Sequence, residues 1–532
     1  MRQKRQYSSR NYSKYNWIGY FKSFSKIFLI ALVITICIQG FKYSKEYYHT
    51  YISFEHNFFQ KSDILATSTG PEQVTVDFSK QISTGSPLIF GGAHMPNLEH
   101  QDAWNKIEDV GVTIIRRDIF IENELPQGIT LQDYKNNVND IQNPDNWNQD
   151  SINFTNSVYK NAKDRGIKIM AIMSYAPAWL TYSGNSHGVP KDWNVFEDIV
   201  KKSYKLHASY IDYIEIWNEP TLPQFLDTTG SSLSSQEAYD QIYYHAYKAI
   251  REAENELNES KSPIGASVGH DPIDTSHLEL IFKNPLTEDS LDFVSYHNYE
   301  AVPEPSWDDY KKILKEYKKE NIPLYLTEWN YSGGKEENVY YRSGTGAITY
   351  TADKFVEYLR MGLKMSNYYA LVDVNRPKYE NDDPSYGFYK WENGIAELLP
   401  QAKTWRLLSR TLRLGEGNSR IFDAKVENDE INSVGFINSN KDTGIILVNK
   451  SDSDTYVTVN IKNINSDNKG VPFYVYIASD KYNGSEIVDR FYLPKNKDNV
   501  YQVTILVPAQ SAEALFVPQD YDWKDTIRSY LP

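Results

Sequence analysis

The sequence predicts an α/β protein: a (β/α)8 barrel of the TIM type with a C-terminal β-sandwich domain and an N-terminal membrane anchor. Three observations support this prediction. From about residue 74 to residue 375, short apolar runs alternate with longer charged stretches, as in a parallel sheet with helical crossovers. From about residue 411, strand-like runs are separated by clusters of Asn, Asp, Ser and Gly, which is typical of a sandwich. Residues 27–41 carry no charge and directly follow a basic head.

These patterns divide the chain into a basic cytoplasmic head (1–26), an anchor or signal segment (27–41), a stalk (42–72), a catalytic barrel (73–410) and a β-sandwich domain (411–532). With 532 residues, 40% of them hydrophobic, the chain can bury large cores without disulfides. Its single cysteine, Cys37, lies in the apolar run, which excludes a cysteine nucleophile or a cysteine-ligated metal in the folded part.

The charge distribution is uneven. Residues 1–26 hold seven Lys or Arg and no acid, so the remaining 506 residues carry the other 49 basic and all 70 acidic residues, a formal charge of −21. A net acidic body argues against nucleic-acid binding. The basic head next to an apolar segment instead predicts a membrane partner, with the chain from residue 42 onward outside the cytoplasm.

The apolar segment, at about 1.5 Å per residue, is short for a ~30 Å hydrocarbon core, so a spanning helix would need Trp17 and Tyr20 at the interface. A cleaved signal peptide, leaving a secreted protein, is the alternative. The long basic head and a poor match to the small-residue cleavage rule favour an uncleaved anchor.

Eight runs are candidate barrel strands, and no glycine-rich phosphate loop follows any of them, which favours a closed barrel over an open nucleotide-binding sheet. They are Leu88 to Phe90, Thr113 to Ile115, Lys168 to Met173, Tyr213 to Ile216, Pro263 to Val268, Asp292 to Tyr296, Pro323 to Leu326 and Tyr368 to Val374.

The predicted sandwich strands are Ser433 to Phe436, Gly444 to Val448, Tyr456 to Ile461, Pro472 to Ile477 and Val503 to Val507. Val74 to Phe78 also alternates as a strand does. Because an isolated strand ahead of a barrel needs partners for its backbone groups, we expect it to pair with the sandwich.

Two of the predicted barrel strands end in glutamates set among aromatic residues. Strand four runs into IEIWNEP with Glu219, and strand seven into LYLTEWN with Glu328. Catalytic groups in a barrel project from the C-terminal ends of strands. Glycosidic cleavage needs two carboxyl groups of unequal pKa, which such a pair supplies across one barrel mouth. The alternative for each glutamate alone is a helix cap or a surface ion pair; Glu215, earlier in strand four, is taken as structural.

Trp217-Asn218-Glu219-Pro220 together with Thr327-Glu328-Trp329 resembles clan A of the retaining glycoside hydrolases, most closely family 39 and related exopolysaccharide-associated endoglycosidases. The resemblance spans about residues 74–520 and implies the added β-sandwich. It implies that Glu219 is the general acid/base, Glu328 the nucleophile and Asn218 the residue that binds the substrate 2-hydroxyl.

Further residues match the clan around the nucleophile. Arg116, after strand two, matches an arginine that would keep the nucleophile ionised, with Arg117 as the alternative register. His297 and Tyr299 match the histidine and tyrosine of strand six, the tyrosine bonding to the nucleophile. A core histidine and a packing tyrosine are the alternatives.

Several residues are candidates for sugar contacts. His94 follows two glycines that let the backbone approach a ligand, although it could equally cap a loop. Tyr175 and Trp179 resemble the sugar platform of the family, and Trp329 is a further stacking candidate, as are Trp193 and Trp391. Strand eight departs from the clan, because it reads Val372-Asp373-Val374 where a tryptophan is often found.

The sequence therefore predicts a retaining glycoside hydrolase that acts on β-glycosidic bonds of an extracellular or cell-surface polysaccharide, with its carboxyl groups about 5–5.5 Å apart. No cofactor is implied, and no HExxH or clustered ligand spacing indicates a metal. The open alternatives are an exo-acting β-xylosidase-like enzyme, a transglycosylase using the same residues, and a non-catalytic saccharide-binding scaffold of polysaccharide export.

Overall fold

A computed structural model describes residues 72–519 except 97, 268, 270–273, 300–305, 332–335, 373–385, 393–394, 416–417, 427, 465–470 and 494–499. These residues belong to one compact unit, 71–532. The predicted head and anchor, and the stalk up to residue 71, lie outside the described residues. Within the described residues, no helix is both long and apolar enough to cross a membrane.

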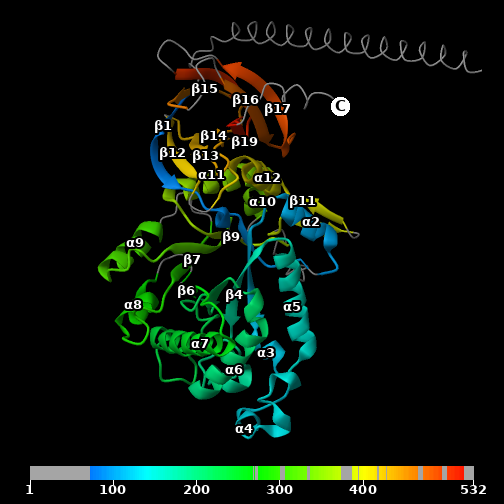
Figure 1. The fold of residues 1–532 in the computed structure, drawn as a ribbon, viewed down its shortest axis with the longest axis vertical. Coiled ribbons are helices and arrows are strands. Elements are labelled where there is room, and N and C mark those ends of the chain that lie inside the picture. The colour runs from blue at the N-terminus through cyan, green and yellow to red at the C-terminus, as the bar shows by residue number, and fades with distance from the viewer. Residues whose placement is uncertain are drawn as a thin grey trace, which may run out of the picture. The chain divides into compact units, whose positions relative to one another are not determined.

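Eight parallel strands close into a barrel (Figure 1). They are β2 (Gly91–Ala93), β3 (Ile114–Phe120), β4 (Lys168–Ser174), β5 (Tyr213–Ile216), β6 (Ile264–Ser267), β7 (Phe293–Tyr299), β8 (Leu324–Asn330) and β9 (Ser366–Tyr368). The main helices between and after them are α2 (Gln101–Asp109), α5 (Gln149–Asp164), α6 (Trp193–His207), α7 (Ser235–Leu257), α8 (Ser276–Lys283), α9 (Ser306–Glu316), α11 (Gly346–Met361) and α12 (Pro400–Leu412). Shorter helices, α3 (Ile121–Glu124), α4 (Leu131–Lys135) and α10 (Glu336–Arg342), lie in the loops after β3 and β8.

The first predicted strand is wrong in its position. Pro87–Ile89 forms a 3-10 turn, because Ser86 accepts a hydrogen bond from the Leu88 N–H and proline suits the first position of such a turn. The strand is the following Gly91–Ala93. A Cβ on Gly91 would lie 2.4 Å from the Ser366 carbonyl oxygen, so these glycines serve strand packing rather than approach to a ligand.

The barrel interior changes character along its axis. Its lower part holds a small apolar cluster, in which the Phe293 ring occupies the space that a Cβ on Gly265 would need. Further along the same strands, toward their C-terminal ends, the interior side chains are buried polar groups, including Arg116, Glu215 and Ser295. A polar layer therefore lies directly beneath the barrel mouth.

The C-terminal domain is one continuous nine-stranded sheet, in the order β17-β16-β19-β14-β13-β12-β1-β15-β18. Phe491 on β17 and Tyr501 on β18, the two end strands of that order, share one core, so the sheet curls upon itself. The sequence predicted a sandwich; the observed strands are joined edge to edge without a break between two sheets. Its C-terminal strands are β12 (Arg420–Val426), β13 (Ile431–Ile437), β14 (Thr443–Asn449), β15 (Thr455–Lys462), β16 (Val471–Ala478), β17 (Asn483–Leu493), β18 (Val500–Val507) and β19 (Ser511–Val517).

The expected pairing of the early strand is confirmed. β1 (Glu72–Thr84), the blue strand in Figure 1, lies between β12 and β15, antiparallel to the first and parallel to the second. The sheet in turn packs against the barrel through α11 and α12. The two ends of the folded chain are thus built into the same sheet.

Candidate active site

Arg116 is the centre of a buried network beneath the barrel mouth. Its Nε lies 2.5 Å from Glu215 Oε2, its Nη1 2.6 Å from Glu328 Oε1, and its Nη2 2.8 Å from Asn218 Oδ1. Burial opposes its charge, but Glu215 and Glu328 together raise the pKa of Arg116 further above its ordinary value. Arg117, the alternative register, instead lies over the Phe154 ring.

Glu215, which was expected to be a structural residue, holds Arg116 in place. It is fully buried and accepts further hydrogen bonds from Thr327 Oγ1, at 3.0 Å, and from Ser295 Oγ. Because this carboxylate is saturated with donors from three strands, it fixes the Arg116 guanidinium and offsets part of its charge.

Glu328 is turned toward the mouth by an irregularity in β8. Tyr296 of β7 pairs with Leu326 of β8, but the next residue of β7, His297, pairs with Glu328. Thr327 is therefore skipped in the pairing of the two strands. Such a bulge re-aims the side chains after it. Tyr299 donates to Glu328 Oε2 at 2.7 Å. Although burial opposes its charge, His297, Arg116 and the Tyr299 hydroxyl lower the pKa of Glu328 to about 2.

Glu219 follows β5 on an unusual backbone. Trp217 and Glu219 have φ values of 70° and 43°, in the left-handed region that non-glycine residues seldom occupy. The Glu219 side chain is buried, and its Oε1 lies 2.7 Å from His297 Nδ1. Strained backbone at this position turns the carboxyl toward the axis of the barrel.

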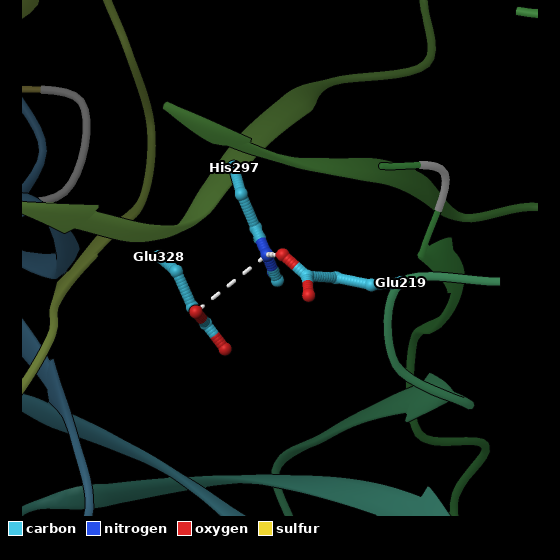
Figure 2. Close-up of side chains that lie close together, drawn as sticks. All are labelled: Glu219, His297 and Glu328. Atoms are coloured by element: carbon cyan, nitrogen blue, oxygen red, sulfur yellow. Dashed lines mark hydrogen bonds and ion pairs between the residues drawn. The ribbon is translucent and has the colours of Figure 1, made fainter. Parts of the chain in front are cut away.

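His297 lies between the two glutamates (Figure 2). The same Nδ1 that bonds to Glu219 is 3.6 Å from Glu328 Oε2. Burial disfavours a charged ring, yet the Glu328 and Glu219 carboxylates raise the pKa of His297 above its ordinary value. One ligand atom from each of the three residues lies within 4.8 Å of the others. These residue types could also hold a cation, although Arg116 and the Tyr299 hydroxyl already occupy both oxygens of Glu328.

Three of the residues predicted to contact a sugar are described first. Tyr175 lies at the site: its ring packs edge-on against Trp217 at 4.9 Å and its hydroxyl contacts Asn218. His94 has φ of 59° and packs edge-on against Tyr369 at 5.1 Å. Trp179 is half-buried and stacks on Tyr134 at 5.7 Å, one turn beyond Tyr175.

Trp329 does not lie at the mouth. The bulge that turns Glu328 inward turns Trp329 outward, where it is fully buried against Phe355 and Tyr358 of α11. Its expected stacking on a sugar is therefore incorrect. Trp193 stacks on His245 between α6 and α7, and the side chain of Trp391 lies outside the described part.

Sequence reasoning missed Tyr369. Strand eight was expected to end at Val374, but it ends at Tyr368, which places Tyr369 at the mouth. The Tyr369 ring lies 6.4 Å from that of Tyr299, and Asn330 Nδ2 donates to its carbonyl oxygen at 2.5 Å. The tyrosine pair at positions 368 and 369 was the available signal; the apolar run that follows it hid the end of the strand.

No protein-family description matches the sequence, and no curated protein matches it. Solved structures do. A glucosidase from Croceicoccus marinus is similar at 12% identity, a TM-score of 0.61, and coverage of 86% of this chain and 100% of the other. A glycoside hydrolase family 39 enzyme from Xanthomonas axonopodis pv. citri is similar at 12% identity and a TM-score of 0.57, over 85% of this chain and 98% of the other.

A glycoside hydrolase family 30 subfamily 8 xylanase from Clostridium acetobutylicum is similar at 12% identity and a TM-score of 0.57, over 84% of this chain and 99% of the other. At such identities the likeness establishes the fold. It spans nearly the whole of each neighbour, so the barrel and the added β-domain are shared together. The fold therefore agrees with the expected resemblance to glycoside hydrolase family 39.

Proposed function

We propose that this protein is a retaining glycoside hydrolase in which Glu328 is the nucleophile and Glu219 the general acid/base. The observation that carries the proposal is the pair of buried carboxyl groups at one barrel mouth, with ligand atoms within 4.8 Å of each other. Retaining enzymes place the two groups about 5–5.5 Å apart, whereas inverting enzymes need roughly 6.5–9.5 Å to admit a water molecule.

The surroundings of the two carboxyl groups fit these unequal roles. Arg116 and Tyr299 both contact Glu328, and its pKa of about 2 keeps it ionised and ready to attack. Glu219 has no arginine or lysine partner among the described residues and is bonded to His297. Glu219 is thus the carboxyl group assigned to pass a proton to the leaving oxygen.

In the first step, a Glu328 oxygen forms a bond to the anomeric carbon as the bond to the leaving oxygen breaks, and Glu219 gives that oxygen its proton. In the second step, ionised Glu219 takes a proton from water, the water oxygen attacks the anomeric carbon, and Glu328 leaves as a carboxylate.

The substrate class is proposed as a β-linked polysaccharide at the cell surface. Two of the structural neighbours are named as a xylanase and a glucosidase, which makes β-xylans and β-glucans the first candidates. The basic head and apolar segment of the sequence favour a tethered enzyme with its barrel outside the cytoplasm.

The test is release of reducing ends by the full chain from β-xylan, β-1,4-glucan and β-1,6-glucan. We expect release by the wild type and its loss in Glu328→Gln and in Glu219→Gln. Azide should restore activity to Glu219→Ala toward substrates with good leaving groups, giving a β-glycosyl azide. Activity that survives Glu328→Gln would refute the assignment, and saccharide binding without any hydrolysis would favour the scaffold.

A further inference from the structure

The backbone that carries Glu219 is held from outside the barrel by one helix. Glu219 has a φ of 43°, and a non-glycine residue keeps such a conformation only where its surroundings impose it. We term residues 216–220 the Glu219 turn. Tyr239 of α7 donates its hydroxyl hydrogen to the Ile216 carbonyl oxygen at 2.9 Å. Ser235 of the same helix donates to the Pro220 carbonyl oxygen at 3.1 Å. Side chains of α7 therefore bond to the turn at both of its ends.

The start of α7 places both side chains. Ser235 and Tyr239 are four residues apart, so they lie one above the other on the same face of the helix. A capping box fixes where the helix begins, because Ser234 accepts from the Glu237 N–H and Glu237 accepts from the Ser234 N–H. Tyr239 is fully buried where α7 packs in the barrel core. The two contacts with the Glu219 turn are thus set by the cap and the packing of the helix.

Ser235 is held in turn by His277 of α8, which packs beside α7 (Figure 1). His277 Nε2 lies 3.0 Å from Ser235 Oγ. Because the single hydroxyl hydrogen of Ser235 goes to Pro220, its oxygen accepts from His277, and this assigns a ring proton to Nε2. Burial lowers the pKa of His277, against an opposing effect of Asp274, so at neutral pH the ring carries this proton alone.

Serine, histidine and aspartate are also the residue types of a hydrolytic triad, but these three do not form one. His277 Nδ1 is 3.6 Å from Asp274 Oδ2, which is beyond hydrogen-bond distance. Asp274 Oδ1 accepts instead from the N–H and the hydroxyl of Ser276. Since His277 donates to Ser235, it is not placed to take a proton from that hydroxyl. The arrangement suits the holding of a carbonyl group rather than attack on a substrate.

The conformation of the Glu219 turn decides where the Glu219 carboxyl group points. A general acid must come within about 2.6–3.2 Å of the oxygen that it protonates. The Glu219 N–H makes a further, longer hydrogen bond of 3.4 Å to Ser267 Oγ on β6. Glu328 is held separately, by Arg116 and Tyr299. Relaxation of the turn would therefore impair protonation of the leaving group while leaving the nucleophile in place.

We infer that Ser235 and Tyr239 are positioning residues for Glu219, which hold its turn in the conformation that brings the carboxyl group to the leaving oxygen. His277 supports this role by fixing Ser235. The inference rests on the proposed glycosidase function. Because both residues act through the backbone, their loss should change how strongly the rate depends on the leaving group.

The test uses the full chain with aryl β-cellobiosides and β-xylobiosides that release 2,4-dinitrophenol, 4-nitrophenol or phenol. Dinitrophenolate leaves without a proton, whereas phenol needs one from Glu219. We expect Tyr239→Phe and Ser235→Ala each to lower kcat/KM about tenfold for the phenyl glycosides and less than about twofold for the dinitrophenyl glycosides. The double variant should lose roughly a hundredfold for the phenyl glycosides. Ser235→Thr, which keeps a hydroxyl group, should recover most of the loss seen in Ser235→Ala.

Tyr243→Phe and Ser290→Ala are the matched controls. Tyr243 lies one turn after Tyr239 on α7 and is also fully buried, and Ser290 Oγ donates to the Thr287 carbonyl oxygen, outside the Glu219 turn. Any loss in these controls should be the same for all three leaving groups. An equal loss for all three in Tyr239→Phe and Ser235→Ala would mean that the two residues only stabilise the fold, and it would overturn the inference, as would unchanged activity.

A crystal structure of the double variant gives a second readout that needs no catalysis. We expect the φ of Glu219 to leave the left-handed region and its Oε1 to move away from His297 Nδ1, which lies 2.7 Å away in the wild type. An unchanged turn would overturn the inference. If the wild type hydrolyses none of the glycosides, the proposed function fails, and the structure of the double variant still decides whether α7 holds the turn.

Discussion

The hydroxyl of Tyr299 is the one uncharged group that bonds directly to Glu328 among the described residues, which makes it the cleanest way to test how that carboxylate is held. Tyr299→Phe removes the hydrogen bond and leaves the ring and the charges of the site in place. A hydrogen bond to a charged group contributes about 1.5 kcal/mol, so the pKa of Glu328 should rise by about one unit from its value near 2.

Because Glu328 must be ionised to attack, the acidic limb of the kcat/KM profile should move to higher pH by a similar amount in Tyr299→Phe. The measurement is a pH–rate profile on an aryl glycoside. The control is Tyr296→Phe on the same strand, whose ring packs against Tyr310 on the outer side of the barrel. An acidic limb that stays in place in Tyr299→Phe would show that the hydroxyl does not influence Glu328.

Another buried carboxyl group, Glu513, lies outside the candidate site, in the β-domain. It is 1% exposed on β19, and burial, with a smaller effect of Asp489, raises its pKa to about 8 from an ordinary 4.5. Below pH 4.5 the group is protonated in both the folded and unfolded chain. Between pH 4.5 and 8 only the folded chain keeps the proton, so the free energy of unfolding falls as pH rises.

Glu513→Gln removes this titration and keeps the shape. We expect the variant to exceed the wild type in free energy of unfolding by about 1–3 kcal/mol at pH 7.5 and to match it near pH 4. Urea unfolding at the two pH values measures this, with the exposed Glu486→Gln as the control. A difference between Glu513→Gln and wild type that is the same at both pH values would argue against a buried neutral carboxyl.

At the scale of single elements, β6 shows how tightly the lower barrel is packed. A Cβ on Gly265 would lie 2.1 Å from Phe293 Cε2 on the neighbouring strand. Gly265→Ala should therefore lower the free energy of unfolding by about 1–3 kcal/mol through overpacking. Adding Phe293→Leu makes room, so the double variant should lose less than the sum of the two single losses, measured as denaturant midpoints. Strict additivity would mean that the two residues do not compete for space.

The burial pattern of each strand explains whether it could be predicted from the sequence. A strand such as β16 buries alternate positions along most of its length and leaves the others half-exposed, so its period is visible in the sequence. β19 is buried at every position, because Leu515 enters the sheet core while Ala514 and Phe516 belong to the core shared with the barrel. It therefore shows no alternation, and the sequence analysis did not find it.

Most residues of the candidate site could also be predicted from the sequence, but one could not be placed correctly. Glu219, Asn218, His297 and Tyr299 come together because each sits at or near the end of a barrel strand, a position that apolar runs mark well. Arg116 was expected after its strand, but β3 continues to Phe120, so Arg116 lies inside the barrel beneath them. Trp329 could not be placed from the sequence, because the bulge in β8 that reverses its side leaves no mark in the pattern of residues.

The whole chain depends on β1 although every residue of the candidate site lies after it. β1 is an interior strand of the nine-stranded sheet, and Val74 and Val76 are fully buried in the core of that sheet. Its removal would separate β12 from β15 and open that core to water. The sheet packs on α11 and α12, which belong to the barrel, so damage to the sheet reaches the catalytic domain.

We therefore expect a chain that begins at residue 85 to be insoluble or inactive, whereas a chain that begins at residue 71 keeps its activity and its melting temperature. Val76→Ala, which removes part of one buried side chain, should lower the Tm of the whole unit in a single transition, because barrel and sheet share one core. Two separate melting transitions, with only the first shifted by Val76→Ala, would show that the barrel folds by itself. Activity in the chain that begins at residue 85 would also show that the barrel folds by itself.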